Sequence, residues 1–244
     1  MGGQAVGRSG GRFLRCAEVT VAAVLLTAGA PDRLSAQVGH EPAHSLYHDV
    51  ARGTVAVVTF GYLGGSRGGV GVGLSNGAIG GIRYEPQFGA IGASLGVAYG
   101  RTTSFVVDPL KDSVSRKSGP YDNAVVVADA GLQLVLTGRK TWRGFAPYVG
   151  GALGVAIAGN LARDSSGYEF GTKITLAPNA GVRWYPARRL SVRGDFRLLL
   201  WKLKYPVSYK VPNAIDGSRV LSLTAALTEW TAHPWATIGV GWTF

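Results

Sequence analysis

The chain has 244 residues, enough for one or two domains, and its formal net charge is +11. Apolar residues make up 46% of the sequence, which excludes a disordered tail, and one cysteine, Cys16, excludes a disulfide-stapled fold. A mean hydropathy of only +0.15 argues against a bundle of transmembrane helices. Glycine accounts for 37 residues and charged residues for only 16%, so the chain is glycine-rich, charge-poor and basic.

Residues 1–36 predict a cleaved signal peptide. Three arginines precede the apolar stretch Val19–Ala30, which is too short to span a bilayer as a helix but suits a signal-peptide core. We expect cleavage between Ala36 and Gln37. A buried N-terminal helix is the alternative interpretation of the same segment.

The rest of the chain alternates with period two, which predicts β-strands. At the C-terminal end one face carries Ile238, Val240, Trp242 and Phe244, and the other carries threonine and glycine. Each alternating run has the length of a tilted strand across a bilayer, about 9–11 residues. The predicted strands are 52–62, 77–87, 90–102, 123–137, 145–158, 172–185, 189–202 and 235–244.

Short and long connections alternate between these runs. Together with the even strand number they predict an all-β fold, a single up-and-down antiparallel transmembrane β-barrel of eight strands. Two alternatives stay open. Arg219–Leu227, in the long connection 203–234, is either a short helix or an extra strand that makes a ten-stranded barrel. Gly144–Ala162 contains no charged residue and is alternatively a transmembrane helix.

The large apolar face is expected to contact lipid, and the face of glycine, alanine, serine, threonine and a few charges is expected to line the narrow interior. Aromatic residues fall at both strand ends, as in interfacial belts. The belt near the short turns comprises Tyr84, Phe88, Phe145, Trp184, Trp242 and Phe244. The belt near the long loops comprises Phe60, Tyr62, Tyr99 and Tyr205, with Trp201 at the wrong parity for a lipid-facing residue.

Eight charged residues occur on the face expected to point inward. Because an isolated buried charge is costly, we expect them to pair and plug the lumen as a structural network. The alternative is a narrow pore that favours anions. The residues are Arg83, Glu85, Asp129, Lys173, Arg183, Arg193, Asp195 and Arg197.

No catalytic, cofactor or metal site is predicted. The pattern Gly92–Gly96 matches G-x-S-x-G, but it lies within a predicted strand and not at a strand-to-helix turn. His233 lies in the last long connection without a serine beside it, so a lipid-modifying enzyme is only an alternative. His40, His44 and His48 recur every fourth residue, yet Pro42 argues against the continuous helix that a shared metal would need.

Three stretches resemble a known family, namely WATIGVGWTF at 235–244, GVRWYPARRLSVRGDFR at 181–197 and FAPYVGGALGVA at 145–156. The chain resembles small eight-stranded outer-membrane β-barrels of the OmpA/OmpX and opacity-protein type. The resemblance implies export through a signal peptide, a periplasmic lead-in segment at 37–51 and a barrel at 52–244. It also implies insertion by the barrel-assembly machinery, with Ile238, Val240, Trp242 and Phe244 as the assembly signal.

The function expected is that of a monomeric outer-membrane barrel with a structural or surface-interaction role. Basic residues near the long loops are expected to meet lipopolysaccharide phosphates, and their dispersal argues against nucleic-acid binding. They are Arg101, Lys111, Arg116, Lys117, Lys202 and Lys204. Other hypotheses are a small pore for anionic or hydrophobic solutes and a soluble secreted barrel that binds an apolar ligand. The soluble barrel predicts an apolar inner face.

Overall fold

The computed structural model describes residues 45–49, 53–159 and 166–244. The predicted signal peptide with its Ala36–Gln37 cleavage site, most of the lead-in segment, and His40 and His44 lie outside the described residues. Among the residues that are described, we find no helix with the length and apolar character needed to cross a membrane.

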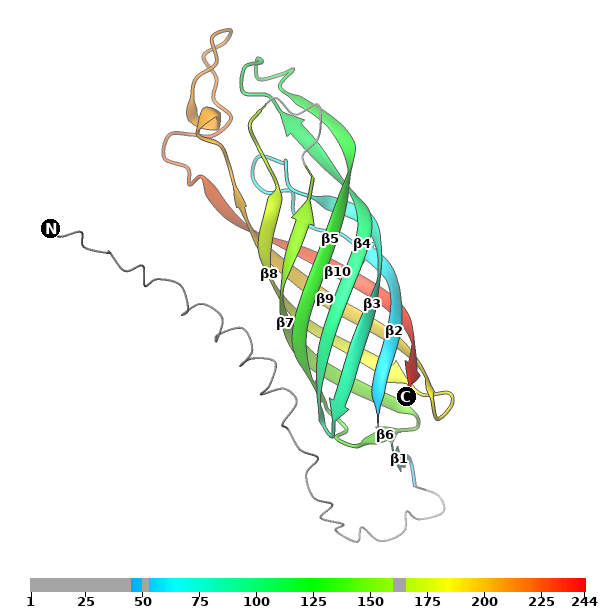
Figure 1. The fold of residues 1–244 in the computed structure, drawn as a ribbon. Helices are drawn as coiled ribbons and strands as arrows, with labels where there is room; N and C mark the ends of the chain where they lie inside the picture. Colours follow the sequence, from blue (N-terminus) through cyan, green and yellow to red (C-terminus); the bar gives the residue numbers. More distant parts are fainter. Residues whose placement is uncertain (1–44, 50–52, 160–165) are drawn as a thin grey trace, which may run out of the picture. The chain divides into compact units, whose positions relative to one another are not determined.

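Eight long antiparallel strands close into a ring in the described part of the chain (Figure 1). Each strand pairs with the next long strand along the chain, and β10 returns to pair with β2. The predicted up-and-down barrel is therefore confirmed. The strands are β2 (Thr54–Leu63), β3 (Ser75–Phe88), β4 (Ile91–Val107), β5 (Lys117–Val135), β7 (Phe145–Ala158), β8 (Gly171–Trp184), β9 (Leu190–Lys204) and β10 (Thr228–Thr243).

The open alternatives of the sequence are resolved by these strands. The ten-stranded barrel is wrong, because Arg219–Leu227 forms neither a strand nor a helix and the ring closes without it. The transmembrane-helix interpretation of Gly144–Ala162 is also wrong, since β7 occupies Phe145–Ala158 and pairs on both sides, with β5 and β8.

Two short strands and one helical turn complete the secondary structure of the described residues. The strand β1 (Tyr47–Asp49) pairs with β6 (Lys140–Trp142), which lies within the connection from β5 to β7. A 3-10 helix, η1 (Val207–Lys210), lies in the connection from β9 to β10. Residues Tyr47–Asp49 are thus attached by backbone pairing to a turn at the short-connection end of the barrel.

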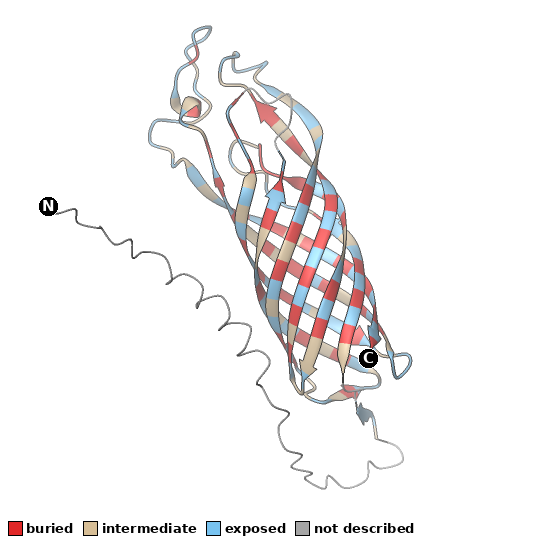
Figure 2. Ribbon diagram, viewed as in Figure 1, coloured by how far each residue is buried: buried red, intermediate tan, exposed pale blue. Residues whose placement is uncertain are grey.

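Burial alternates along every long strand, as Figure 2 shows by its red and pale-blue bands. Outward aliphatic side chains such as Val58, Ile82 and Ile174 are 65–77% exposed, so the barrel presents a continuous apolar outer surface. Glycine permits close approach of strands on the inner face. A Cβ atom at Gly61 would lie 2.1 Å from the carbonyl oxygen of Ala236.

Three strands extend five to seven residues farther than predicted at the long-loop end, whereas β2, β3, β8 and β9 extend only one or two residues farther. The strands β4 and β5 continue to the pairs Val106–Ser118 and Val107–Lys117, and β10 begins at Thr228 instead of 235. Ladder hydrogen bonds continue beyond the alternating apolar pattern there. The long connections are correspondingly shorter than predicted, at 64–74, 108–116, 159–170 and 205–227.

Candidate functional site

The barrel interior near the short turns is an ionic layer. Seven of the eight inward charges predicted from the sequence are buried there and joined by ion pairs. The pairs are Arg83–Asp129, Arg197–Asp129, Arg183–Glu85, Arg193–Glu85 and Arg193–Asp195. They come from β3, β5, β8 and β9. Four arginines therefore face three carboxylates across the lumen.

Glu85 is the centre of this ionic layer and is fully buried. Arg193 donates to its Oε1 atom at 2.5 Å, and Arg183 donates to its Oε2 atom at 3.1 Å. Arg193 also donates to both carboxylate oxygens of Asp195 at 2.7 Å and to the Tyr148 hydroxyl. Charge-assisted bonds of this kind fix side chains in one geometry.

Asp129 forms a second ionic centre. It accepts from Arg83 through Oδ1 and from Arg197 through Oδ2, the latter at 3.1 Å. Each of the two central carboxylates, Glu85 and Asp129, thus accepts from two arginines that belong to different strands. The layer ties opposite walls of the barrel together.

Lys173, the eighth predicted charge, lies apart from this layer. It is half-buried near the long-loop end of β8, and its ammonium lies 5.7 Å from the centroid of the Phe170 ring. The inner-face parity predicted for Lys173 agrees with its burial. Lys173 does not belong to the ionic layer, although the sequence predicted it there. It precedes Arg183 by ten residues along β8, which separates the two side chains along the barrel axis.

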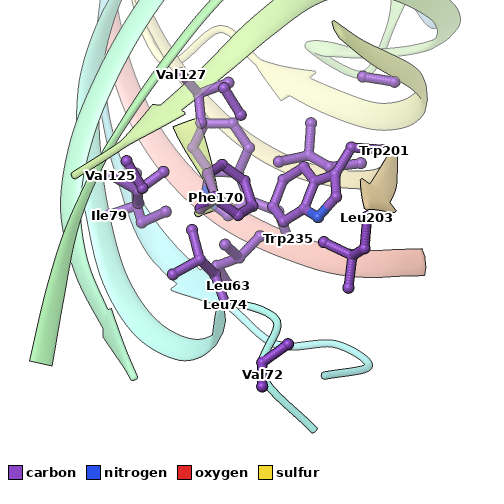
Figure 3. Close-up of a cluster of buried hydrophobic side chains, with 14 of the residues drawn as sticks. Leu63, Val72, Leu74, Ile79, Val125, Val127, Phe170, Trp201, Leu203 and Trp235 are labelled. Atoms are coloured by element: carbon purple, nitrogen blue, oxygen red, sulfur yellow. The ribbon is translucent and has the colours of Figure 1, made fainter. Parts of the chain in front are cut away.

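The long-loop half of the interior is apolar and aromatic, which differs from the expected inner face of glycine and charges. Figure 3 shows Phe170, Trp201 and Trp235 packed with aliphatic side chains of several strands. Trp201 and Leu203 are fully buried. The loop after β2 contributes Val72 and Leu74 to the same cluster. The expectation for Tyr205 was wrong, since it is buried here and not in a lipid-facing belt.

This apolar layer does not convert the protein into the soluble ligand-binding barrel of the alternative hypothesis. Its side chains pack against one another, and the outer face is apolar as well. Large aromatic side chains stay exposed at both strand ends, among them Phe60, Tyr62, Tyr99, Phe88 and Trp184. A soluble barrel has no reason to expose so much apolar surface.

His233 lies inside the barrel and not in a loop, because β10 begins earlier than predicted. Its imidazole is fully buried, stacks on Trp201 and lies 2.9 Å from the Thr231 hydroxyl. Ser94, the serine of the Gly92–Gly96 pattern, is buried within β4. Neither residue has the exposed position that a nucleophile or base needs to meet a substrate.

Two long loops are joined above the barrel. Asp216, in the loop before β10, accepts hydrogen bonds from the Ser113 backbone and from Ser218 at 2.6–2.9 Å. Asn213 donates to the Lys111 carbonyl, and Arg116 donates to Ser218. Hydrogen bonds from Ser218 and then from Ser113 hold the pKa of the Asp216 carboxyl well below its ordinary value. We call these contacts the loop clasp.

A separate contact fastens the glycine-rich loop 64–74. The Glu229 carboxylate accepts from the Gly69 backbone at 2.8 Å and from the Tyr205 hydroxyl at 2.7 Å. Burial, followed by the hydrogen bond to Glu229, raises the pKa of the Tyr205 phenol. This contact therefore holds in place a loop whose Val72 and Leu74 side chains pack in the apolar layer.

The remaining predicted residues lie on the surface. The four residues of the C-terminal signal, Ile238, Val240, Trp242 and Phe244, are 49–74% exposed on the outer face. His48 is exposed on β1, where Thr141 is its partner in register. Among the basic residues of the long-loop end, Arg116 is half-buried in the loop clasp and the others are exposed.

Comparisons with known proteins support the fold. No protein-family profile matches the sequence, and no curated protein matches it. The outer-membrane protein OprG of Pseudomonas aeruginosa is similar in structure, with a TM-score of 0.50 and 14% identity over 80% of this chain and 98% of OprG. The likeness shows that this chain has the fold of small outer-membrane β-barrels.

Two further solved structures align at lower scores. Neisserial surface protein A gives a TM-score of 0.46 at 14% identity, covering 82% of this chain and 98% of that protein. The N-terminal β-barrel domain of Pseudomonas aeruginosa OprF gives 0.42 at 15% identity, covering 79% and 98%.

Proposed function

We propose that this barrel is an integral outer-membrane protein with a structural or surface-interaction role, and that its lumen is closed to solutes. Two stacked layers support the closure. The ionic layer around Glu85 and Asp129 occupies the short-turn half, and the aromatic layer around Trp201 occupies the long-loop half. An eight-stranded barrel is only just wide enough for its own side chains, so two layers of large inward side chains are suited to block it.

The single observation that carries this proposal is the complete burial of Glu85 between Arg183 and Arg193. A water-filled pore would hydrate such a carboxylate, whereas a dry layer requires paired charges. The alternative of an anion-selective pore has fewer features in its favour, since three carboxylates lie among the four arginines and offset their positive charge.

A role at the cell surface is favoured by the ordered loops. The loop clasp and the Glu229 contact hold the loops 64–74, 108–116 and 205–227 in place, and loops held on a rigid barrel are suited to recognition. We assign no chemical reaction to the chain, in keeping with the buried positions of Ser94 and His233. Exposed basic residues such as Lys111 and Lys202 are suited to lipopolysaccharide phosphates.

Biogenesis is part of the same proposal. We infer that residues 1–36 direct export, that 37–51 is a periplasmic lead-in, and that the barrel-assembly machinery recognises the outward aromatic residues Trp242 and Phe244. Their exposure on the last strand leaves them accessible to such a partner. We propose that the mature protein is a monomer.

Conductance in planar lipid bilayers tests the closed lumen. Refolded protein, with insertion verified by heat-modifiable migration in gels, is expected to carry no steady current. A variant in which Trp201, Arg193 and Glu85 are all replaced by alanine should conduct if it inserts. Steady current through the unmodified protein would refute the plug and favour the pore.

A further inference from the structure

The three short connections of the barrel carry charge of a single sign, although β1, which pairs with β6 at this rim, adds the exposed carboxylate Asp49 opposite Lys140. The three connections, 89–90, 136–144 and 185–189, contain five basic residues and no acidic residue. The long loops, by contrast, contain both signs. Four of the basic residues are exposed and make no ion pair with any residue that the structure describes: Arg139, Arg143, Arg188 and Arg189. We call these four the rim arginines.

Three rim arginines lie beside exposed aromatic residues or their immediate neighbours. The Arg143 guanidinium carbon is 5.6 Å from the centroid of the Trp142 ring. A Cβ atom at Gly89, the neighbour of Phe88, would lie 3.1 Å from Arg139 Nε. The Arg189 carbonyl accepts a hydrogen bond from Thr243, the residue between Trp242 and Phe244, at 2.8 Å.

The aromatic residues fix the depth of these cations in a bilayer. Phe145 and Trp184 stack with ring centroids 6.3 Å apart, and both are more than 40% exposed on the outer face. Exposed aromatic girdles on membrane barrels mark the level of the lipid headgroups. The guanidinium groups next to this girdle are therefore at the height of the lipid phosphates.

We propose that the rim arginines bind the headgroups of anionic phospholipids, such as phosphatidylglycerol, in the leaflet that faces the short turns. A planar guanidinium donates two hydrogen bonds to one phosphate and is weakly hydrated, so it suits this depth. Zwitterionic lipids present the same phosphate with a compensating cation. The rim is therefore expected to prefer headgroups with a net negative charge, and added salt is expected to weaken this electrostatic attraction.

This inference rests on the proposed membrane-spanning function, and a quenching experiment separates the two. Trp142, Trp184 and Trp242 are exposed at the rim, Trp230 is exposed at the other end, and the remaining two tryptophans are inside. A Trp230→Phe variant therefore leaves only rim tryptophans accessible to lipid. This variant is reconstituted in vesicles of phosphatidylcholine in which either that lipid or an admixed phosphatidylglycerol is brominated.

At low salt, we expect brominated phosphatidylglycerol to quench the tryptophan fluorescence severalfold more than its share of the lipid predicts. At high salt, this excess quenching should be smaller. Replacing all four rim arginines with glutamine should reduce quenching to the random level. The matched control replaces Arg101, Lys111, Lys202 and Lys204 with glutamine and should keep the preference. The double variant R188Q/R189Q, confined to one exposed turn, should lose part of it.

Quenching in proportion to lipid composition by the unmodified rim would overturn the inference and assign the surface to a water-soluble partner. A preference that persists without the rim arginines would also overturn it. Absence of quenching by either lipid would instead show that the chain does not insert, and would refute the proposed function.

Discussion

The Trp201 indole stacks on the His233 imidazole across the β9–β10 pair, with ring centroids 3.9 Å apart and 23° between the ring planes. Both side chains are fully buried. The pair lies at the centre of the aromatic layer, where Phe170 meets the indole edge-on at 5.6 Å. Stacking of this kind fixes the relative position of neighbouring side chains beyond simple burial.

Replacing Trp201 with alanine should lower the free energy of unfolding by about 3–5 kcal/mol, because a large cavity opens in a packed layer. Urea unfolding in detergent micelles measures this loss. The matched control is Trp230→Ala, which removes the same side chain from an exposed position at the same end of the barrel. Equal losses for the two variants would contradict the aromatic layer.

Replacing Glu85 with alanine should destabilise the barrel by about 3–5 kcal/mol, because Arg183 and Arg193 lose their shared buried anion. The change should also lower the temperature at which gel migration shifts. Glu169→Ala, which removes an exposed carboxylate, serves as control. A Glu85 variant as stable as the control would show that the ionic layer is hydrated.

Replacing Asp216 with asparagine should expose the segment Lys111–Lys117 to trypsin in intact membranes, because the loop clasp loses its charged acceptor. Asp112→Asn is the control, since its carboxylate accepts from Ser115 within the same loop. The result expected is several times faster cleavage for the first variant. Equal cleavage rates would mean that the clasp does not hold the loops.

The clasp should also resist mild acid. A carboxyl with a depressed folded pKa stabilises the folded arrangement at all pH values above its unfolded pKa, about 3.9, and loses that effect only as pH falls through the lower folded value. Trypsin is inactive there, so pepsin cleavage at Leu110, the exposed residue just before this segment, is measured from pH ~5 downward. Release of the loop near pH ~5 would contradict the assignment to Asp216.

Replacing Phe244 with alanine should lower the amount of protein that reaches the outer membrane, because the last strand loses an exposed aromatic residue of the proposed assembly signal. Fractionation and gel migration measure this amount. Phe88→Ala removes a similarly exposed aromatic residue from the end of β3 on the same rim and should assemble normally. Unchanged levels for the Phe244 variant would count against the assembly signal.

Period-two alternation was sufficient to predict the eight strands and the inner position of the charged residues. It could not predict the aromatic layer, because runs such as Leu198–Trp201 are apolar on both faces and the alternation then does not distinguish inward from outward positions. A run that is apolar on both faces is itself informative, because a strand carries two apolar faces where both of its sides are shielded from water. The loop clasp depends on residues about 100 positions apart, such as Ser113 and Asp216, and no local pattern encodes it.

The sharing of each central carboxylate by two arginines constrains how this lineage can change. A single substitution at Glu85 removes the ion pair of Arg183 and leaves Arg193 paired with Asp195 alone, and a single substitution at either arginine leaves the acid half-compensated. If the lumen is closed as proposed, a variant that conducts ions has to exchange several of these residues together. The surface loops contain no such shared ion pairs, so sequence variation should accumulate in the loops while the barrel interior stays the same.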